Sequence, residues 1–331
     1  MKVVIDSAIP FLNGVLEPYA EVLYRNGSDI SKEDVASADA LIVRTRTRCS
    51  QELLEGTKVK FIATATIGFD HIDTDYCQHN DIEVVTAAGC NAAAVLQWVA
   101  AVLCELSHIE GWHPEQRTLG IVGVGNVGSL VERYARAWGF HILRCDPPRQ
   151  LREEGDFVSL EEVAAKSDII TFHTPLDAST HHLLNDKIIE LLPPHATIIN
   201  ASRGEVAATS ALLKTHHRLA LDVWEREPFI DNTLLEKAFI STPHIAGYSA
   251  QGKANASAMS VHALARRFSL PLTEWYPHQV TPTQRKEISW EEMCRTIREH
   301  CDIMGESLQL KKHSDQFEAL RNNYHYREEY F

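Results

Sequence analysis

The sequence contains no pair of cysteines in a C-x-x-C arrangement, although it holds 7 cysteines in all. An odd number of scattered cysteines disfavours both a disulfide framework and a structural zinc site. We therefore interpret these residues as buried or incidental thiols and expect no bound metal.

Positive charge is also scarce. The chain has 32 lysines and arginines against 45 aspartates and glutamates, which gives a formal net charge of −13. An acidic protein is repelled by nucleic acid and by anionic membrane surfaces, so we expect neither as a partner. An anionic substrate would need a local cluster of basic residues.

Long apolar runs are absent too. No stretch approaches the ~20 apolar residues that span a bilayer, and the N-terminal residues MKVVIDSAIPFL do not form a signal peptide. Both absences predict a cytoplasmic protein. With 331 residues, of which 44% are hydrophobic and 23% are charged, the chain can form two or three globular domains.

A dinucleotide-binding pattern lies in residues 118–149. An apolar run leads into Gly123, Gly125 and Gly128, spaced as G-x-G-x-x-G, and apolar residues at helical spacing follow. The first glycine makes a tight turn, the second lets a pyrophosphate approach the backbone, and the third allows the helix to pack on the strand. The pyrophosphate would then bind at the helix N-terminus, where free N–H groups favour an anion.

Asp146 ends the next apolar run. It follows the last glycine at about the usual interval of 20 residues for an acid that binds the adenosine ribose hydroxyls. A carboxylate there repels the 2′-phosphate of NADP, so we predict NAD as the cofactor, although Arg149 close by keeps NADP open. A G-x-G-x-x-G alone is commonly just a glycine-rich turn, but here strand, helix and acid are in register.

Apolar strands alternate with helical segments over most of the chain, which is typical of α/β proteins. We predict two doubly wound domains, one flavodoxin-like and one Rossmann, with a cleft between them, and a small C-terminal α/β or α dimerisation segment. The expected bounds are 1–91 plus about 252–282 for the substrate-binding domain, 92–251 for the NAD-binding Rossmann domain, and 283–331 for the C-terminal segment.

Three arginines follow one strand of the first domain, at the edge where open parallel sheets bind ligands. Arg44, Arg46 and Arg48 lie within five residues of one another. They fit either a solvated loop or an anion site, because guanidinium groups hold phosphate and carboxylate by paired charge-assisted hydrogen bonds. Arg44 and Arg46 are our candidates for substrate binding.

Three further charged residues stand at predicted strand ends of the second half: Arg203 in NASRG, Glu227 in LDVWEREP and His244 in TPHIAGY. Oxidation of a 2-hydroxy acid by hydride transfer needs a cation for the carboxylate, a base for the hydroxyl proton and a group that supports the base. Arginine, histidine and glutamate can fill these roles. Taken singly each is ordinary, since His244 is one of 17 histidines and Glu227 before Pro228 also fits a turn.

These motifs, in this order, resemble the D-isomer-specific 2-hydroxyacid dehydrogenase family over about residues 1–270. The resemblance implies NAD-dependent oxidation of a phosphorylated small hydroxy acid. It implies that Arg203 orients the substrate, that His244 exchanges the proton and that Glu227 is its partner. It also implies contacts of NAD with Asn126, Val127, Asp146, Thr174, Ser202, Asp222 and Gly247, and of substrate with Thr45, Thr66 and Tyr248.

Two alternatives stay open. The first is a dehydrogenase for another D-2-hydroxy acid, such as 3-phosphoglycerate. The second is a non-catalytic protein of the same fold that senses NADH, against which the intact Arg203, Glu227 and His244 argue. Gln97 departs from the glutamate of many relatives, and we expect that change to affect a helix contact only.

The C-terminal segment suggests an oligomer. Apolar residues at helical spacing over 289–305 predict one amphipathic helix, and aromatic residues gather near the end of the chain. A segment this small buries too little of its own surface, so we predict that 283–331 pairs two copies in a homodimer. We further expect Arg321 or Arg327 to reach the active site of the partner.

Overall fold

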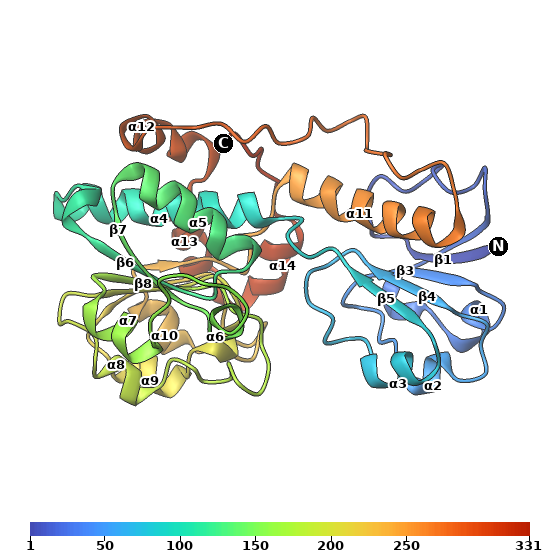
Figure 1. The fold of residues 1–331 in the computed structure, drawn as a ribbon, viewed down its shortest axis with the longest axis horizontal. Helices are drawn as coiled ribbons and strands as arrows, with labels where there is room; N and C mark the ends of the chain where they lie inside the picture. The colour runs from blue at the N-terminus through green and yellow to red at the C-terminus, as the bar shows by residue number, and fades with distance from the viewer. The chain divides into compact units, whose positions relative to one another are not determined.

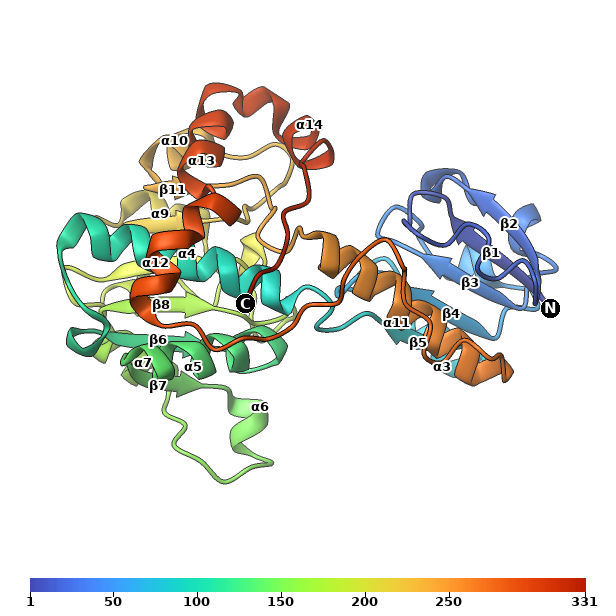
Figure 2. The ribbon, with the colours of Figure 1, turned by 90° about the horizontal axis from the view of Figure 1, so that it is seen from above.

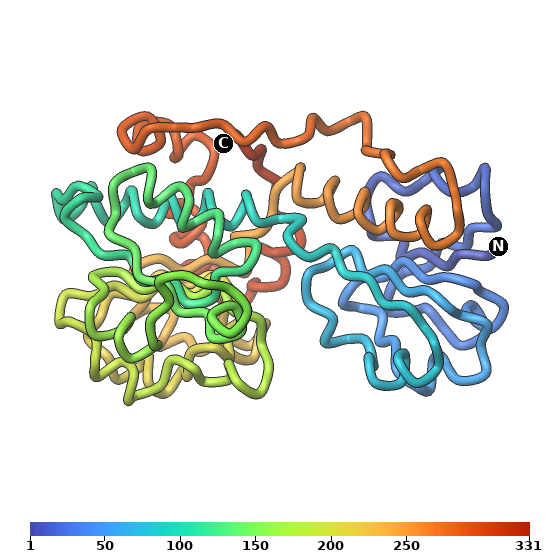
Figure 3. Tube along the Cα trace, in the orientation of Figure 1, coloured from blue at the N-terminus to red at the C-terminus, as the bar shows by residue number.

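The structure is a computed structural model that describes residues 1–331. It divides into two compact units. The first unit comprises 1–91 and 250–283, and the second comprises 92–249 and 284–331. Figure 3 traces the chain through these segments in order. The C-terminal residues therefore belong to the second unit and do not form a unit of their own.

The first unit contains a five-stranded parallel sheet in the order β2-β1-β3-β4-β5, which is the flavodoxin-like order. Its strands are β1 (Lys2–Asp6), β2 (Glu21–Arg25), β3 (Ala40–Val43), β4 (Phe61–Thr64) and β5 (Glu83–Thr86). Its helices are η1 (Gly27–Asp29), α1 (Lys32–Val35), α2 (Gln51–Leu54), α3 (Thr74–His79) and α11 (Ala250–Phe268).

Both faces of this sheet are covered, because successive side chains of a strand point to opposite faces. Val4 of β1 packs in the cluster on the side of α1 to α3, whereas Val3 and Ile5 pack with Val261 and Leu264 of α11. The two helical layers are visible on opposite sides of the sheet in Figure 1. Apolar sequences such as that of β3 are therefore required on both faces.

The second unit contains a six-stranded parallel sheet in the order β11-β10-β9-β8-β6-β7. Its strands are β6 (Thr118–Val122), β7 (His141–Cys145), β8 (Ile169–Phe172), β9 (Thr197–Asn200), β10 (Arg218–Leu221) and β11 (Ile240–Ser241). A single parallel bridge joins Arg144 of β7 to Phe157. Residue 157 thus occupies the place of the third strand in the Rossmann order, reduced here to one bridge.

Helices cover both faces of the second sheet as well (Figure 1). They are α4 (Ala92–Glu110), η2 (Pro114–Gln116), α5 (Asn126–Trp138), α6 (Pro147–Gln150), α7 (Leu160–Lys166), α8 (Asp186–Ile189), η3 (Gly204–Val206), α9 (Thr209–Lys214), α10 (Asn232–Lys237), α12 (Trp290–His300), α13 (Ile303–Lys312), η4 (Ser314–Gln316) and α14 (Phe317–Asn322). Two hydrophobic clusters form, one with α4, α5 and α12 and one with α7 to α10. The predicted α/β fold with two doubly wound parallel sheets is confirmed.

Helix α4 corrects one expectation from the sequence. It is long and apolar enough by length and composition to cross a membrane, with a mean hydropathy of 1.6. However, 78% of its most apolar window is buried inside the protein. Its side chains pack against α5 and α12, and the Trp98 indole N–H donates to Thr242. Core packing therefore accounts for its composition.

The C-terminal segment differs from the single helix that we predicted over 289–305. The helix ends at His300, and Asp302 caps a new helix by accepting from the N–H of Gly305. Figure 2 shows α12 over α4 and α13 beside β11. The helical spacing did not reveal the break, because Cys301 and Met304 keep to the same stripe across it.

The aromatic residues at the end of the chain pack on their own unit. Phe331 is 1% exposed, and its ring lies 5.3 Å from that of Tyr134 and 6.3 Å from that of Trp138. Gln97 of α4 donates to the Phe331 carbonyl oxygen. These contacts remove the main argument that the segment needs a second copy to cover it, so the homodimer stays a prediction.

The packing of this segment predicts a large effect of Trp290→Ala on stability. Trp290 is 7% exposed and its ring contacts those of Trp112, Trp138 and Phe140. We expect the free energy of unfolding to fall by about 3–5 kcal/mol, as for other buried aromatic truncations. Denaturant unfolding followed by circular dichroism measures it. Leu308→Ala is the control, because that side chain is 68% exposed; equal losses in both variants would contradict the prediction.

Candidate active site

The glycine turn after β6 has the geometry of a dinucleotide-binding loop. Gly123 has a φ of 85°, and a Cβ there would lie 2.8 Å from the backbone of His173. A Cβ on Gly128 would lie 2.0 Å from the Gly123 carbonyl oxygen. A Cβ on Gly125 would meet nothing within 4 Å, and no side chain caps α5. The first and third glycines are thus needed for packing, whereas the second leaves open space at a helix N-terminus that favours an anion.

Asp146 is held beside this turn. Its carboxylate accepts from the N–H groups of Val124 (2.8 Å) and Arg149 (2.9 Å). The Arg149 side chain donates to the Val124 carbonyl oxygen and pairs with Glu153 at 2.6 Å, so its guanidinium is already bound within the protein. Thr174 places a buried hydroxyl without a hydrogen-bond partner on the loop after β8. These groups fit NAD, because the acid opposes a 2′-phosphate and the hydroxyl lacks a partner.

This arrangement predicts the effect of Asp146→Asn on cofactor choice. The amide keeps the shape but removes the charge, so we expect the ratio of kcat/KM with NADP to that with NAD to rise roughly tenfold. Asp156→Asn makes the same change on an exposed residue and should leave the ratio unaltered. The two cofactors are compared in steady-state assays. If wild-type protein uses NADP as well as NAD, the assignment of Asp146 is wrong.

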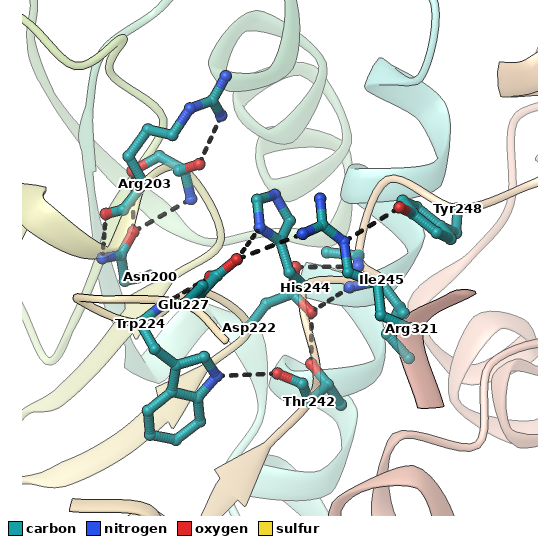
Figure 4. A network of polar contacts seen from close by, with 12 residues as sticks. Asn200, Arg203, Asp222, Trp224, Glu227, Thr242, His244, Ile245, Tyr248 and Arg321 are labelled. Atoms are coloured by element: carbon teal, nitrogen blue, oxygen red, sulfur yellow. Dashed lines mark hydrogen bonds and ion pairs between the residues drawn. The ribbon is translucent and has the colours of Figure 1, made fainter. Parts of the chain in front are cut away.

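His244 and Glu227 form a hydrogen-bonded pair at the carboxyl ends of β10 and β11. His244 Nδ1 lies 2.7 Å from Glu227 Oε2, and the other carboxylate oxygen accepts from the Trp224 N–H at 3.0 Å. His244 has a φ of 57°, and its backbone N–H donates to the carbonyl oxygen of Asp222. Because a carboxylate only accepts, Nδ1 carries the proton and Nε2 is free to take one from a substrate. Figure 4 shows the pair.

Glu227 is held in its charged form. Burial alone would raise the pKa of Glu227, but the charge and hydrogen bond of His244, the Trp224 N–H and the charge of Arg321 together hold this pKa below its usual value. An ionised carboxylate at this distance stabilises the imidazolium that forms when His244 accepts a proton. The pair therefore has the arrangement of a general base with its supporting acid.

Asp222 fixes the loop that carries His244. Its carboxylate accepts from the Thr242 hydroxyl at 2.6 Å and from the N–H groups of Ile245 (2.8 Å) and Ala246 (3.0 Å). Burial raises the pKa of Asp222 above its usual value, although these hydrogen bonds and His244 oppose the rise. The resemblance implied that Asp222 contacts NAD, and the structure adds a loop-holding role that the sequence did not indicate.

Arg203 follows β9, the neighbour of β10 in the sheet. The Asn200 side chain donates to the Arg203 carbonyl oxygen at 2.9 Å and accepts from the Ser202 hydroxyl at 2.8 Å, which fixes the turn. A Cβ on Gly204 would lie 2.0 Å from the Trp224 backbone, so the turn lies directly against the Glu227 loop. Arg203 Nη1 donates only to the Ser202 carbonyl oxygen. A guanidinium in this position can bind a carboxylate.

Arg321 is the functional candidate that the sequence placed wrongly. We expected Arg321 or Arg327 to reach a partner subunit. Instead, Arg321 donates to the Tyr248 hydroxyl at 3.1 Å and lies 3.6 Å from Glu227 of its own chain. Arg327 is buried and donates to the carbonyl oxygens of Ala94 and Ile245. In the sequence, both arginines were marked only by lying in the aromatic-rich segment near the end of the chain.

The other proposed substrate residues lie in the first unit. Arg44, Thr45 and Arg46 follow β3, and Thr66 follows the neighbouring β4, so they share one edge of the sheet. Arg44 Nε pairs at 2.9 Å with Asp6, whose side chain is fully buried. One nitrogen of the Arg44 guanidinium is therefore already paired with a carboxylate of the protein. The Thr66 hydroxyl lies 2.6 Å from that of Thr64.

Metal-binding groups are not found. No group of three or more His, Cys, Asp or Glu residues in 1–331 could hold a metal ion. All 7 cysteines are free thiols.

Comparison with known proteins identifies the family. The family described as D-isomer specific 2-hydroxyacid dehydrogenase, NAD binding domain, matches residues 89–246. An erythronate-4-phosphate dehydrogenase of Bacteroides thetaiotaomicron is 44% identical over 99% of this chain and 97% of its own length. A protein of the same name from Bacteroides fragilis is 47% identical with the same coverage.

Solved structures agree with this relationship. The NAD-bound 3-phosphoglycerate dehydrogenase of Entamoeba histolytica is 25% identical, with a TM-score of 0.66 over 82% of this chain and 97% of that one. A D-lactate dehydrogenase of Aquifex aeolicus, solved with NAD and lactic acid, shares the fold with a TM-score of 0.65, at 24% identity over 82% of this chain and 96% of that one. The predicted NAD cofactor and dehydrogenase class are confirmed. The chain therefore belongs to the D-isomer specific 2-hydroxyacid dehydrogenase family, as an NAD-dependent dehydrogenase in the group that includes the two Bacteroides erythronate-4-phosphate dehydrogenases.

Proposed function

We propose that the enzyme oxidises 4-phospho-D-erythronate at C2 to (R)-3-hydroxy-2-oxo-4-phosphooxybutanoate, a step of pyridoxine and pyridoxal phosphate biosynthesis. The substrate follows from the names of relatives that are 44% and 47% identical over 99% of the chain. The chemistry is supported by one observation above all, the 2.7 Å hydrogen bond between His244 and Glu227. That bond leaves Nε2 of His244 as a base, and the Arg203 turn lies against the loop that carries Glu227.

Each proposed residue has a defined task in this reaction. Arg203 binds the substrate carboxylate and so orients C2. His244 Nε2 takes the hydroxyl proton, and Glu227 stabilises the resulting imidazolium. The glycine turn, Asp146 and Thr174 would hold NAD, which would supply the hydride acceptor that balances the oxidation.

For the phosphate end of the substrate we propose contacts with basic side chains and with hydroxyl side chains that the family resemblance implies. Arg46 and the remaining nitrogens of Arg44 provide positive charge, and the hydroxyls of Thr45 and Thr66 provide neutral hydrogen bonds. We propose the Tyr248 hydroxyl as a further substrate contact. The basic residues make a phosphorylated acid a better substrate than an unphosphorylated one.

The decisive experiment follows NADH formation with three acids: 4-phospho-D-erythronate, D-erythronate and D-3-phosphoglycerate. We expect the highest kcat/KM with 4-phospho-D-erythronate. A higher value with D-3-phosphoglycerate would support the alternative dehydrogenase. NADH binding without turnover of any of these acids would instead support a sensor.

We further propose a cytoplasmic homodimer. Free cysteines are typical of a reducing compartment, and the one apolar helix of membrane-spanning length is mostly buried in the core. Light scattering of the intact protein tests the dimer directly. Deleting residues 284–331 would be a poor test, because Met293, Ile297 and Phe331 are core residues of the second unit.

A further inference from the structure

Arg321 comes from the C-terminal segment, yet it lies among the proposed catalytic residues. It belongs to α14, whose first residue, Phe317, is 1% exposed in the core of the second unit. The Arg321 side chain is 32% exposed, so most of it is buried. A cation placed this way is not a freely solvated surface charge.

The guanidinium connects two functional groups. Nε donates to the Tyr248 hydroxyl at 3.1 Å, and Nη1 lies 3.6 Å from Glu227 Oε2. That oxygen is the one that binds His244 Nδ1. Figure 4 shows Arg321 between Tyr248 and the histidine–glutamate pair. One carboxylate oxygen therefore faces both the imidazole and the guanidinium.

We propose that Arg321 is a positioning residue of the dehydrogenase site, which holds Glu227 and the Tyr248 hydroxyl and opposes a second positive charge beside that carboxylate before the substrate proton is transferred. This inference rests on the proposed function, because it requires His244 to act as the base.

The electrostatic argument has a definite sign. Arginine stays protonated at any working pH, so Arg321 keeps its positive charge throughout. Protonation of His244 would place a second positive charge against the same carboxylate, and a nearby like charge disfavours it. Arg321 therefore opposes a second positive charge beside this carboxylate. The other ionisable groups that face these residues are Asp222 and Tyr248.

Tyr248 is also positioned by apolar contacts. Its ring meets those of Tyr324 and Tyr326 edge-on, with centroids 6.2 Å and 6.0 Å away. Loss of the Arg321 hydrogen bond should therefore leave the ring near its place. The main consequence of removing the cation is expected at the Glu227–His244 pair.

The test compares the pH dependence of kcat/KM in wild type, Arg321→Gln and Arg321→Lys. We expect Arg321→Gln to move the acid limb to higher pH by about half a unit to one unit, because the guanidinium no longer opposes a second positive charge beside Glu227. Arg321→Lys keeps the charge and should restore most of the wild-type position. Arg295→Gln is the matched control, since it removes an exposed arginine of α12 in the same segment. Circular dichroism and NADH binding check that each variant is folded.

An acid limb that stays in place in Arg321→Gln, with activity lowered equally at every pH, would overturn the inference. An equal shift in Arg295→Gln would also overturn it, because the shift would then result from the change in the net charge of the protein. The assay uses whichever 2-hydroxy acid the wild type oxidises fastest. Inactivity of the wild type with every acid would refute the proposed function, and this inference with it.

Discussion

Replacing His244 by alanine is expected to lower kcat/KM by ~10²–10⁴-fold, the usual cost of losing a general base. Nδ1 of this histidine is bound to Glu227, and Nε2 is left to accept the substrate proton. Binding of NADH should stay close to the wild-type value, because the glycine turn and Asp146 make no contact with the imidazole. Steady-state NADH formation and a fluorescence titration with NADH measure the two quantities separately.

A matched control exists within the same unit. His195 forms a similar pair with Asp168, at 2.6 Å, but its side chain is 58% exposed and Asp168 precedes β8 at the opposite edge of the sheet. His195→Ala removes the same kind of interaction and should retain nearly full activity. Near-normal kcat in His244→Ala would show that another group is the base. A strong loss of activity in His195→Ala would show that the loss in such variants comes from impaired folding and not from removal of the base.

Arg203→Ala is expected to lower kcat/KM by roughly 10²–10³-fold, because a charge-assisted hydrogen bond to the substrate carboxylate is lost. The fold of the turn should survive, since Asn200 binds backbone and hydroxyl groups there and not the guanidinium. Arg203→Lys keeps the charge without the planar fork, and we expect it to recover only part of the activity.

The control for Arg203 is Arg136→Ala, which removes an arginine of α5 that pairs with Glu132 and is 50% exposed. Its activity should match the wild type. Unchanged kcat and KM in Arg203→Ala would mean that a different cation binds the carboxylate. Loss of NADH binding in Arg203→Ala would instead indicate a damaged cofactor site.

Local patterns were sufficient for much of the nucleotide site. The glycine spacing and Asp146 predicted a strand, turn and helix in consecutive residues. The structure shows the close approach or open space that was expected at each glycine. These features depend on backbone sterics over a few residues, which sequence reports directly. The reduced third strand at Phe157 could not be predicted in this way, since a single bridge leaves no alternating pattern.

The catalytic pair was predicted from chemistry and family resemblance, but its geometry was not. The separation of 17 positions between Glu227 and His244 in the sequence does not determine that Nδ1 meets Oε2 at 2.7 Å. Asp222 brings this about by holding the loop after β11 through three hydrogen bonds. Its buried carboxylate acts on backbone groups, which have no signature in the sequence.

The sequence by itself determined the α/β alternation, the dinucleotide turn and the types of residue available for hydride transfer, because these follow from periodicity, backbone sterics and side-chain chemistry within short stretches. Only the tertiary structure decided what the C-terminal segment contacts. An apolar stripe and an aromatic cluster indicate that a surface must be covered, but they do not indicate whether the same chain or a second copy covers it. Here the core of the second unit covers Trp290 and Phe331, and the same packing brings Arg321 to Glu227.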